Sequence, residues 1–255
     1  MILSKTMENP QDSYSNIFGN KKRILVVMPH PDDTELYAGG TIARLLSDGK
    51  RVRVVKMTFG DRGCQQEEIT KEKLREKREK EDREAMKVLG IWDEDNVYLG
   101  INDGGIEDDL KTIGKVVYQI RVFQPELIIT TNPEDSFIRF EKDVNWVNHR
   151  DHRNCAKVTV DAAYPYSRDL LFFPEQLKKA GVKPHICSQF LLTDYYNHPD
   201  LIYIKVTGFI EKRVQAHASH ASQYSHQDAQ SSADFFTRIE GATERFERFR
   251  YVVGD

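Results

Sequence analysis

The feature that most constrains this fold is a strand that ends abruptly in a cluster of polar residues. Residues 24–28 form an apolar run that is rich in β-branched side chains and preceded by basic residues, a pattern typical of a buried parallel strand. Pro29 and Pro31 flank His30 directly after this run. Because proline cannot donate a backbone hydrogen bond and biases the preceding residue toward an extended conformation, the strand must stop here.

A helix is expected to begin directly after the prolines. Its apolar stripe recurs at helical spacing, at Leu36, Ala43, Leu45 and Leu46. The pair at residues 39–40 is Gly-Gly, which allows close backbone approach in the first turns. A polar cluster therefore lies where a strand passes into a helix, the place where open α/β sheets bind their ligands.

His30, Asp32 and Asp33 supply the groups that a metal-dependent hydrolase needs. Histidine nitrogen and carboxylate oxygen are zinc ligands, and His30 and Asp33 can converge on one ion across a tight turn. Asp32 then stays off the metal and can act as a general base, since a nearby cation favours its ionised form. The alternative is a plain helix N-terminus, in which Asp32, Asp33 or Thr34 caps the first backbone amides.

A second cluster, at residues 148–153, can complete this site. His149 and His152 share one face if a helix begins there, and Asp151 is available as their hydrogen-bond partner. By itself, such a cluster also suits a solvated loop. Both clusters follow predicted strands and so belong to the same sheet edge. Together they predict a site of two histidines and one carboxylate.

The chain resembles the LmbE-like, or PIG-L, family of zinc-dependent N-acetylglucosaminyl deacetylases. The opening motif of that family, His-Pro-Asp-Asp-x-Glu-Leu followed by Gly-Gly-Thr, stands at residues 30–36 and 39–41. Its second motif, His-x-Asp-His, stands at residues 149–152. Weaker family patterns follow in the expected order, at residues 58–63, 78–90, 99–104 and 220–223. The resemblance extends over residues 22–225.

This resemblance implies a zinc ion held by His30, Asp33 and His152, although the same ligand set also holds Fe²⁺. It also implies hydrolysis of the N-acetyl group of an N-acetylglucosamine-type sugar or its conjugate, with release of acetate. The expected partner is a small amino-sugar substrate.

The expected catalytic roles follow from the same assignment. Asp32 deprotonates the water that attacks the acetamide carbonyl. His149, kept protonated by Asp151, stabilises the oxyanion or donates a proton to the leaving amine. Arg78 matches a helix arginine that helps to orient substrate in the family, and Arg62, in the loop after the second strand, is a second candidate for substrate binding.

Strands and helices alternate along the chain, which predicts a single α/β domain with a Rossmann-like, mainly parallel sheet flanked by helices. Residues 1–21 are expected to form a polar, loosely ordered N-terminal extension, and residues 22–255 the deacetylase domain. No Gly-x-Gly-x-x-Gly follows the first strand, which argues against a dinucleotide ligand. Residues 233–251 are expected to form an amphipathic helix.

Two irregular segments are of interest. Residues 132–148 are long for a mere connection and carry Phe137, Phe140 and Trp146. These aromatic side chains either pack on a sugar face or seal the segment onto the domain. Residues 164–184 are expected to form a surface excursion near the mouth of the site.

Composition argues against several classes of protein. The net charge of −3 gives no footprint for nucleic acid, and no apolar run reaches the roughly 18 residues of a membrane span. The three cysteines are scattered without metal-type spacing, which favours a reducing compartment. Since residues 1–22 also lack the apolar core of a signal peptide, we expect a cytoplasmic protein. A homo-oligomer is a further expectation, because small enzymes often form closed symmetric assemblies.

Three other functions remain open on the sequence alone. The chain could be a metal-dependent amidase that acts on a different N-acyl substrate. It could be a Rossmann-like protein that binds a nucleotide or cofactor without hydrolysis. A non-catalytic interaction module is the third alternative, which the retention of Asp32 beside all three expected ligands disfavours.

Overall fold

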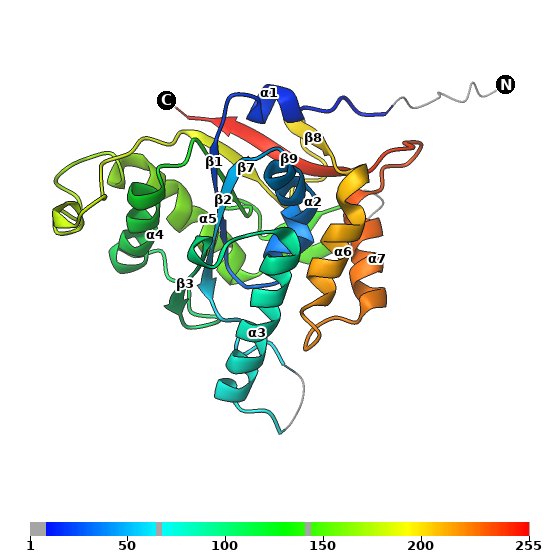
Figure 1. The fold of residues 1–255 in the computed structure, drawn as a ribbon, viewed down its shortest axis with the longest axis horizontal. Helices are drawn as coiled ribbons and strands as arrows, with labels where there is room; N and C mark the ends of the chain where they lie inside the picture. Colours follow the sequence, from blue (N-terminus) through cyan, green and yellow to red (C-terminus); the bar gives the residue numbers. More distant parts are fainter. Residues whose placement is uncertain (1–8, 65–67, 141–143, 255) are drawn as a thin grey trace.

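The computed structural model describes residues 9–64, 68–140 and 144–254, which build a seven-stranded central sheet (Figure 1). The strand order is β3-β2-β1-β4-β7-β9-β8. The parallel strands are β1 (Arg23–Met28), β2 (Arg51–Thr58), β3 (Asn96–Ile101), β4 (Leu127–Thr130) and β7 (Gln189–Leu192). β9 (Phe246–Val253) pairs antiparallel with both β7 and the edge strand β8 (Leu201–Lys205). The predicted Rossmann-like, mainly parallel sheet is therefore confirmed.

Helices cover both faces of the sheet (Figure 1). The longer ones are α2 (Asp33–Ser47), α3 (Lys71–Leu89), α4 (Leu110–Phe123), α5 (Arg150–Asp161), α6 (Ile210–Ala218) and α7 (His226–Thr237). The short ones are α1 (Tyr14–Phe18), η1 (Asp93–Asp95), η2 (Ala162–Tyr166), η3 (Gln176–Lys178) and η4 (Thr207–Phe209). β5 (Phe137–Arg139) and β6 (Asn145–Val147) form a separate antiparallel pair.

Alternate side chains of β1 supply two apolar cores, because successive residues of a strand point to opposite faces. Ile24, Val26 and Met28 pack with side chains of α2, α3, α6 and α7. Leu25 and Val27 pack with side chains of α4 and α5 on the other face. All five are fully buried, which explains why the strand reads as a continuous apolar run rather than as an alternating one.

Because Gly40 has no side chain, helix α2 packs closely against Val206, which follows β8, and against β9. A Cβ atom at this position would lie only 2.8 Å from Cβ of Val206. The backbone N–H groups of Gly40 and Thr41 donate to the buried carboxylate of Glu247 on β9, at 2.8 and 2.7 Å. Arg213 of α6 lies 3.5 Å from the same carboxylate and balances its charge. These contacts fix the helix whose first residue is a candidate metal ligand.

The predicted amphipathic helix over residues 233–251 is wrong in its second half. Helix α7 ends at Thr237, and residues 246–253 form β9, which pairs with β7 and β8. Phe246 and Phe249 are three residues apart and so imitate helical spacing, but both are buried in the sheet layer. Tertiary pairing on both sides therefore overrides the local pattern.

Part of the expected N-terminal extension packs on the domain. Tyr14, Ile17 and Phe18 are buried in the core that contains α2. The Ser13 backbone N–H also donates to the Tyr203 carbonyl on β8, at 2.8 Å. Residues 1–8 of the extension lie outside the described residues.

The expectation that residues 164–184 lie at the mouth of the site is wrong. Five backbone carbonyls of this segment accept hydrogen bonds from the buried guanidinium of Arg121 on α4, those of Tyr166, Ser167, Asp169, Phe172 and Phe173. The segment is therefore anchored to α4, and none of its residues lines the candidate pocket described below.

In the described ranges, no helix combines the length and apolar character needed to cross a membrane.

Candidate active site

The candidate site lies at the carboxyl ends of β1 and β4, where the strand order reverses. A switch point of this kind opens a crevice that side chains following both strands can reach. His30, Asp32 and Asp33 follow β1 and lead into α2, whereas His149 and His152 lie at the start of α5, beyond β4. All five line one pocket with a volume of about 500 Å³.

His30, Asp33 and His152 come together in this pocket. Their ligand atoms all lie within 4.8 Å of one another. His30 Nδ1 is 3.0 Å from Asp33 Oδ2, and His152 Nε2 is 3.4 Å from Asp33 Oδ1. Two imidazoles around one carboxylate are a donor set that suits a divalent ion such as Zn²⁺ or Fe²⁺.

Each of the two histidines also meets a carboxylate at its other ring nitrogen. His30 Nε2 lies 3.2 Å from Asp103 Oδ1 and 3.5 Å from Asp151 Oδ2. His152 Nδ1 lies 3.9 Å from Asp194 Oδ2. Histidines that bind metals usually donate their second N–H to such a carboxylate, which orients the ring. The two nitrogens left for a metal are those nearest the shared carboxylate, so the arrangement fits a bound ion.

A second trio, His30, His149 and Asp151, also brings its ligand atoms within 4.8 Å. However, the Asp151 carboxylate already accepts hydrogen bonds from the backbone N–H groups of Gly104 and Ile106, at 2.7 and 3.3 Å. Asp151 therefore suits the role of a positioning group for His30 better than that of a ligand.

A third cluster lies deeper, where Glu35, Asp82 and His220 are fully buried. The Lys56 ammonium sits 2.8 Å from the Asp82 carboxylate and is itself fully buried. Since this lysine already provides the compensating cation, the cluster is an internal ion-pair network rather than a metal site.

Asp32 belongs to none of these trios and pairs with Arg78, whose Nη2 lies 2.8 Å from Asp32 Oδ1. Burial opposes ionisation of Asp32, but the Arg78 guanidinium together with the nearby His220 and His30 outweighs it, so the pKa of the carboxyl lies well below its usual range. Tyr224 adds a hydrogen bond to the same carboxylate. The Asp32 side chain makes no capping hydrogen bond to α2. The helix-cap alternative therefore does not describe it.

The loop after β2 forms a seat for Arg78. Its Nη1 donates to the Gly60 carbonyl at 2.6 Å. Gly60 adopts a left-handed φ of +61°, and a Cβ atom there would collide with the guanidinium. The Gly60 N–H in turn donates to the Thr58 hydroxyl at 3.1 Å. This seat explains how an arginine in the middle of α3 reaches the pocket.

The structure corrects the expected protonation of His149. Its Nδ1 accepts a hydrogen bond from the Asp151 backbone N–H at 3.2 Å, so His149 caps α5. Burial lowers the pKa of His149, and the neighbouring His30 and His152 lower it further. The Asp151 carboxylate faces His30 instead. The lowered pKa and the accepting Nδ1 together favour a neutral imidazole that carries its proton on Nε2.

Arg62 lies on the exposed rim of the same pocket, where its backbone N–H donates to Asp103 at 2.8 Å.

The sequence motifs gave no role to three further residues at the site: Tyr37, Asp194 and Tyr224. Tyr37 follows Asp33 by four residues on α2, so helical spacing alone could have placed it in the pocket. Asp194 lies just beyond β7, at the same sheet edge, in a left-handed conformation with φ 63°.

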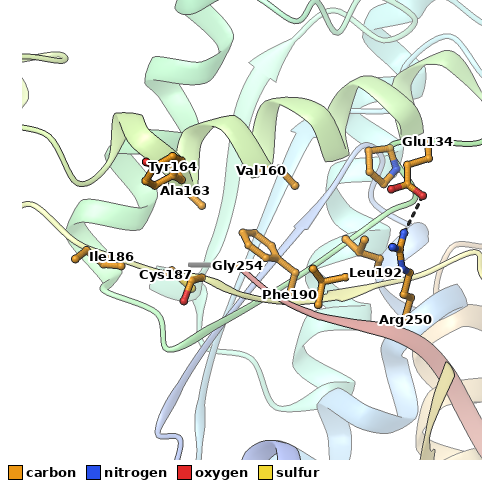
Figure 2. A pocket seen from close by; sticks show the side chains of 13 residues that line it. Glu134, Val160, Ala163, Tyr164, Ile186, Cys187, Phe190, Leu192, Arg250 and Gly254 are labelled. Atoms are coloured by element: carbon orange, nitrogen blue, oxygen red, sulfur yellow. Dashed lines mark hydrogen bonds and ion pairs between the residues drawn. The ribbon is translucent and has the colours of Figure 1, made fainter. Parts of the chain in front are cut away.

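A separate apolar pocket of about 410 Å³ lies between α5 and the β7–β9 strands (Figure 2). Val160, Phe190 and Leu192 line it, and the Glu134–Arg250 ion pair of 2.8 Å closes one end. None of the candidate site residues at the β1–β4 crevice lines this pocket. The chemistry of the described residues is therefore concentrated at the β1–β4 crevice.

Comparison with known proteins gives relatives that include a deacetylase and an amidase. The diacetylchitobiose deacetylase of Thermococcus kodakarensis is 25% identical over 208 residues, which cover 81% of this chain and 72% of that protein. The mycothiol S-conjugate amidase of Streptomyces coelicolor is 29% identical over 197 residues, which cover 69% of this chain and 60% of that protein.

A solved structure shares the fold. The N,N'-diacetylchitobiose deacetylase from Pyrococcus horikoshii, complexed with an inhibitor, superposes with a TM-score of 0.78 at 24% identity, over 93% of this chain and 86% of that one. Residues 25–163 match the model of the PIG-L family, described as GlcNAc-PI de-N-acetylase. That match contains both histidine clusters and spans more than half of the sequence, and so this chain belongs to the PIG-L family.

Proposed function

We propose that this protein is a metal-dependent hydrolase that removes the N-acetyl group from an N-acetylglucosamine-type sugar or its conjugate. The observation that carries the proposal is the meeting of His30, Asp33 and His152 beside the Asp32–Arg78 pair in one open pocket. The relatives support the substrate class, because one acts on diacetylchitobiose and another on mycothiol S-conjugates.

His30, Asp33 and His152 would hold the metal, as Zn²⁺ or Fe²⁺. When bound, such an ion polarises a carbonyl oxygen and makes water a stronger nucleophile at neutral pH. Asp103, Asp151 and Asp194 would orient the two imidazoles, in line with their distances to the outer ring nitrogens.

Asp32 would accept a proton from water as the water oxygen attacks the acetamide carbon. Its ion pair with Arg78 keeps the Asp32 carboxylate ionised and fixes its orientation in the pocket. His149 would donate a hydrogen bond from Nε2–H to the carbonyl oxygen as negative charge develops there. When the C–N bond breaks, the protonated Asp32 returns the proton to the amine nitrogen. The products are acetate and the free amine, and Arg62 on the rim would contact the sugar.

The test combines elemental analysis with acetate release from a panel of N-acetylated sugars. We expect about one divalent ion per chain and equal amounts of acetate and free amine, with activity lost on chelation and restored by Zn²⁺ or Fe²⁺. A panel of longer N-acyl sugars separates a deacetylase from an amidase of broader scope. Full activity in metal-free protein would overturn the metal assignment, and no acetate from any sugar would overturn the function.

A further inference from the structure

Aromatic side chains lead from the candidate site to the protein surface. Tyr37 lines the pocket, and its ring centroid lies 6.0 Å from that of His152. On its other side, Tyr37 meets Phe236 of α7 at 5.7 Å, edge to face. Phe236 in turn lies 5.7 Å from Trp146 of β6. An unbroken series of rings therefore connects the proposed metal ligand His152 to β6.

The series ends in two exposed rings, Trp146 and Phe235. They stack with a centroid distance of 5.4 Å and an interplanar angle of 5°. Each residue is 43% exposed. Phe140 lies beneath both, at 4.7 and 5.0 Å, and is itself buried. The two exposed rings thus pack on the buried Phe140 ring, which holds them in place and leaves their apolar surface in water. We call the pair Trp146 and Phe235 the aromatic platform.

The chain connects this platform directly to the proposed catalytic machinery. Trp146 lies on β6, only three residues before His149, and α5 begins directly after His149. Phe235 lies on α7, which begins two residues after the pocket residue Tyr224 and is fixed there by a capping box between Ser225 and Asp228. Each of the two exposed rings therefore lies on an element that directly adjoins a pocket residue, His149 after β6 and Tyr224 before α7.

We propose that Trp146 and Phe235 form a subsite for a second ring, joined to the sugar that carries the scissile acetamide. This inference rests on the proposed function and deepens it. The acetamide-bearing ring would lie against Tyr37, and the next ring would pack the C–H face of its pyranose on the aromatic platform. Such a surface recognises an uncharged ring through apolar contact and is sequestered from water only when that ring is present. The preferred substrate class is a disaccharide or a larger N-acetylglucosamine conjugate rather than the free monosaccharide.

The kinetic test compares N,N'-diacetylchitobiose with N-acetylglucosamine in wild type, Trp146→Ala and Phe235→Ala. Trp92→Ala is the matched control, because Trp92 is the other tryptophan of the chain, is 68% exposed and lines neither the pocket nor the platform. We expect each platform variant to lower the disaccharide-to-monosaccharide ratio of kcat/KM by about tenfold, mainly through KM. The control should keep the wild-type ratio. An unchanged ratio in both platform variants overturns the subsite, while acetate release by wild type still supports the proposed function.

A fluorescence experiment tests the subsite independently of catalysis. In Trp92→Phe, all tryptophan emission comes from Trp146. Saturating N,N'-diacetylchitobiose should shift or quench this emission, and N-acetylglucosamine should do so far less. This response in a protein that releases no acetate would keep the subsite and refute the proposed function. Equal responses to the two sugars refute the subsite. Dissociation of an assembly by Trp146→Ala, seen by light scattering without a change in the sugar response, would make the platform a contact between copies of this chain and also overturn the subsite.

Discussion

Arg78 Nη2 lies 2.8 Å from Asp32 Oδ1, so the proposed general base is held by a residue of a different helix. The pair joins the middle of α3 to the N-terminus of α2. Because Arg78 also bonds the Gly60 carbonyl, its position depends on the loop after β2. Catalysis and the packing of three segments are therefore coupled at one guanidinium.

Asp32→Asn should lower kcat by about 10²–10⁴-fold while the metal content stays at the wild-type level, since an amide cannot accept the proton and Asp32 is not a proposed ligand. Steady-state kinetics and elemental analysis of the same preparation check both parts. Asp93→Asn, at an exposed aspartate in η1, is the matched control and should behave as wild type. Wild-type turnover in Asp32→Asn with normal metal content would remove Asp32 from the mechanism.

Gly60→Ala should destabilise the protein and reduce activity together, because the new Cβ collides with Arg78 in addition to the strain of a left-handed alanine. Gly49→Ala isolates the strain, since Gly49 has φ +73° and open space around its Cβ position. The control should lose about 1–2 kcal/mol of unfolding free energy and keep its activity. Denaturant unfolding and kinetics on both variants make the comparison. Equal losses of stability, with activity intact in both, would contradict the proposed seat for Arg78.

Asp194→Asn should weaken metal affinity by about 10–100-fold, the usual effect of losing a carboxylate that orients a metal-bound histidine. Competition with a chromogenic chelator measures this affinity directly. Asp200→Asn changes an exposed aspartate a few residues further along and serves as control. If both variants retained the metal equally well, Asp194 would have no part in orienting His152.

His217 should make stability fall as the solution is acidified. Burial lowers its pKa to about 4, and neither ring nitrogen has a hydrogen-bond partner within the described ranges. The unfolded chain therefore binds a proton near pH 6.5 that the native state refuses until about pH 4. The contribution of neutral His217 to the free energy of unfolding is complete above pH 6.5. It falls by roughly 3 kcal/mol as the pH decreases toward 4.

His217→Leu removes this proton linkage. The difference in unfolding free energy between wild type and variant should therefore change across that pH interval and stay constant above it. Urea unfolding at several pH values provides the measurement. A difference that does not vary with pH would show that His217 is not buried as a neutral group.

The sheet and the approach of His30, Asp33 and His152 to one another could be predicted because each follows from a local pattern. The run at residues 24–28 is typical of a buried strand, and the prolines after it placed His30 at the carboxyl edge. A second histidine cluster, after another predicted strand, was expected at the same edge. Parallel strands convert such sequence positions into proximity without any knowledge of side-chain packing.

Features that depend on packing could not be predicted in this way. The stretch around Phe246 and Phe249 has helical spacing, and only the vacant position between β7 and β8 makes it a strand. The neutral state of His149 depends on a backbone N–H that its own helix presents. Arg78 was assigned through resemblance, although its position four residues after Leu74 places it on the buried face of α3.

The place of β9 has a consequence for the order of assembly during synthesis. β8 leaves the ribosome about forty residues before β9, the strand that separates it from β7. Until then, β7 presents an open edge to any other extended peptide. Glu247, which β9 brings to the backbone of α2, arrives with the same strand. The nascent chain can thus have both histidine clusters in place while the helix that carries Asp33 still lacks its final anchor.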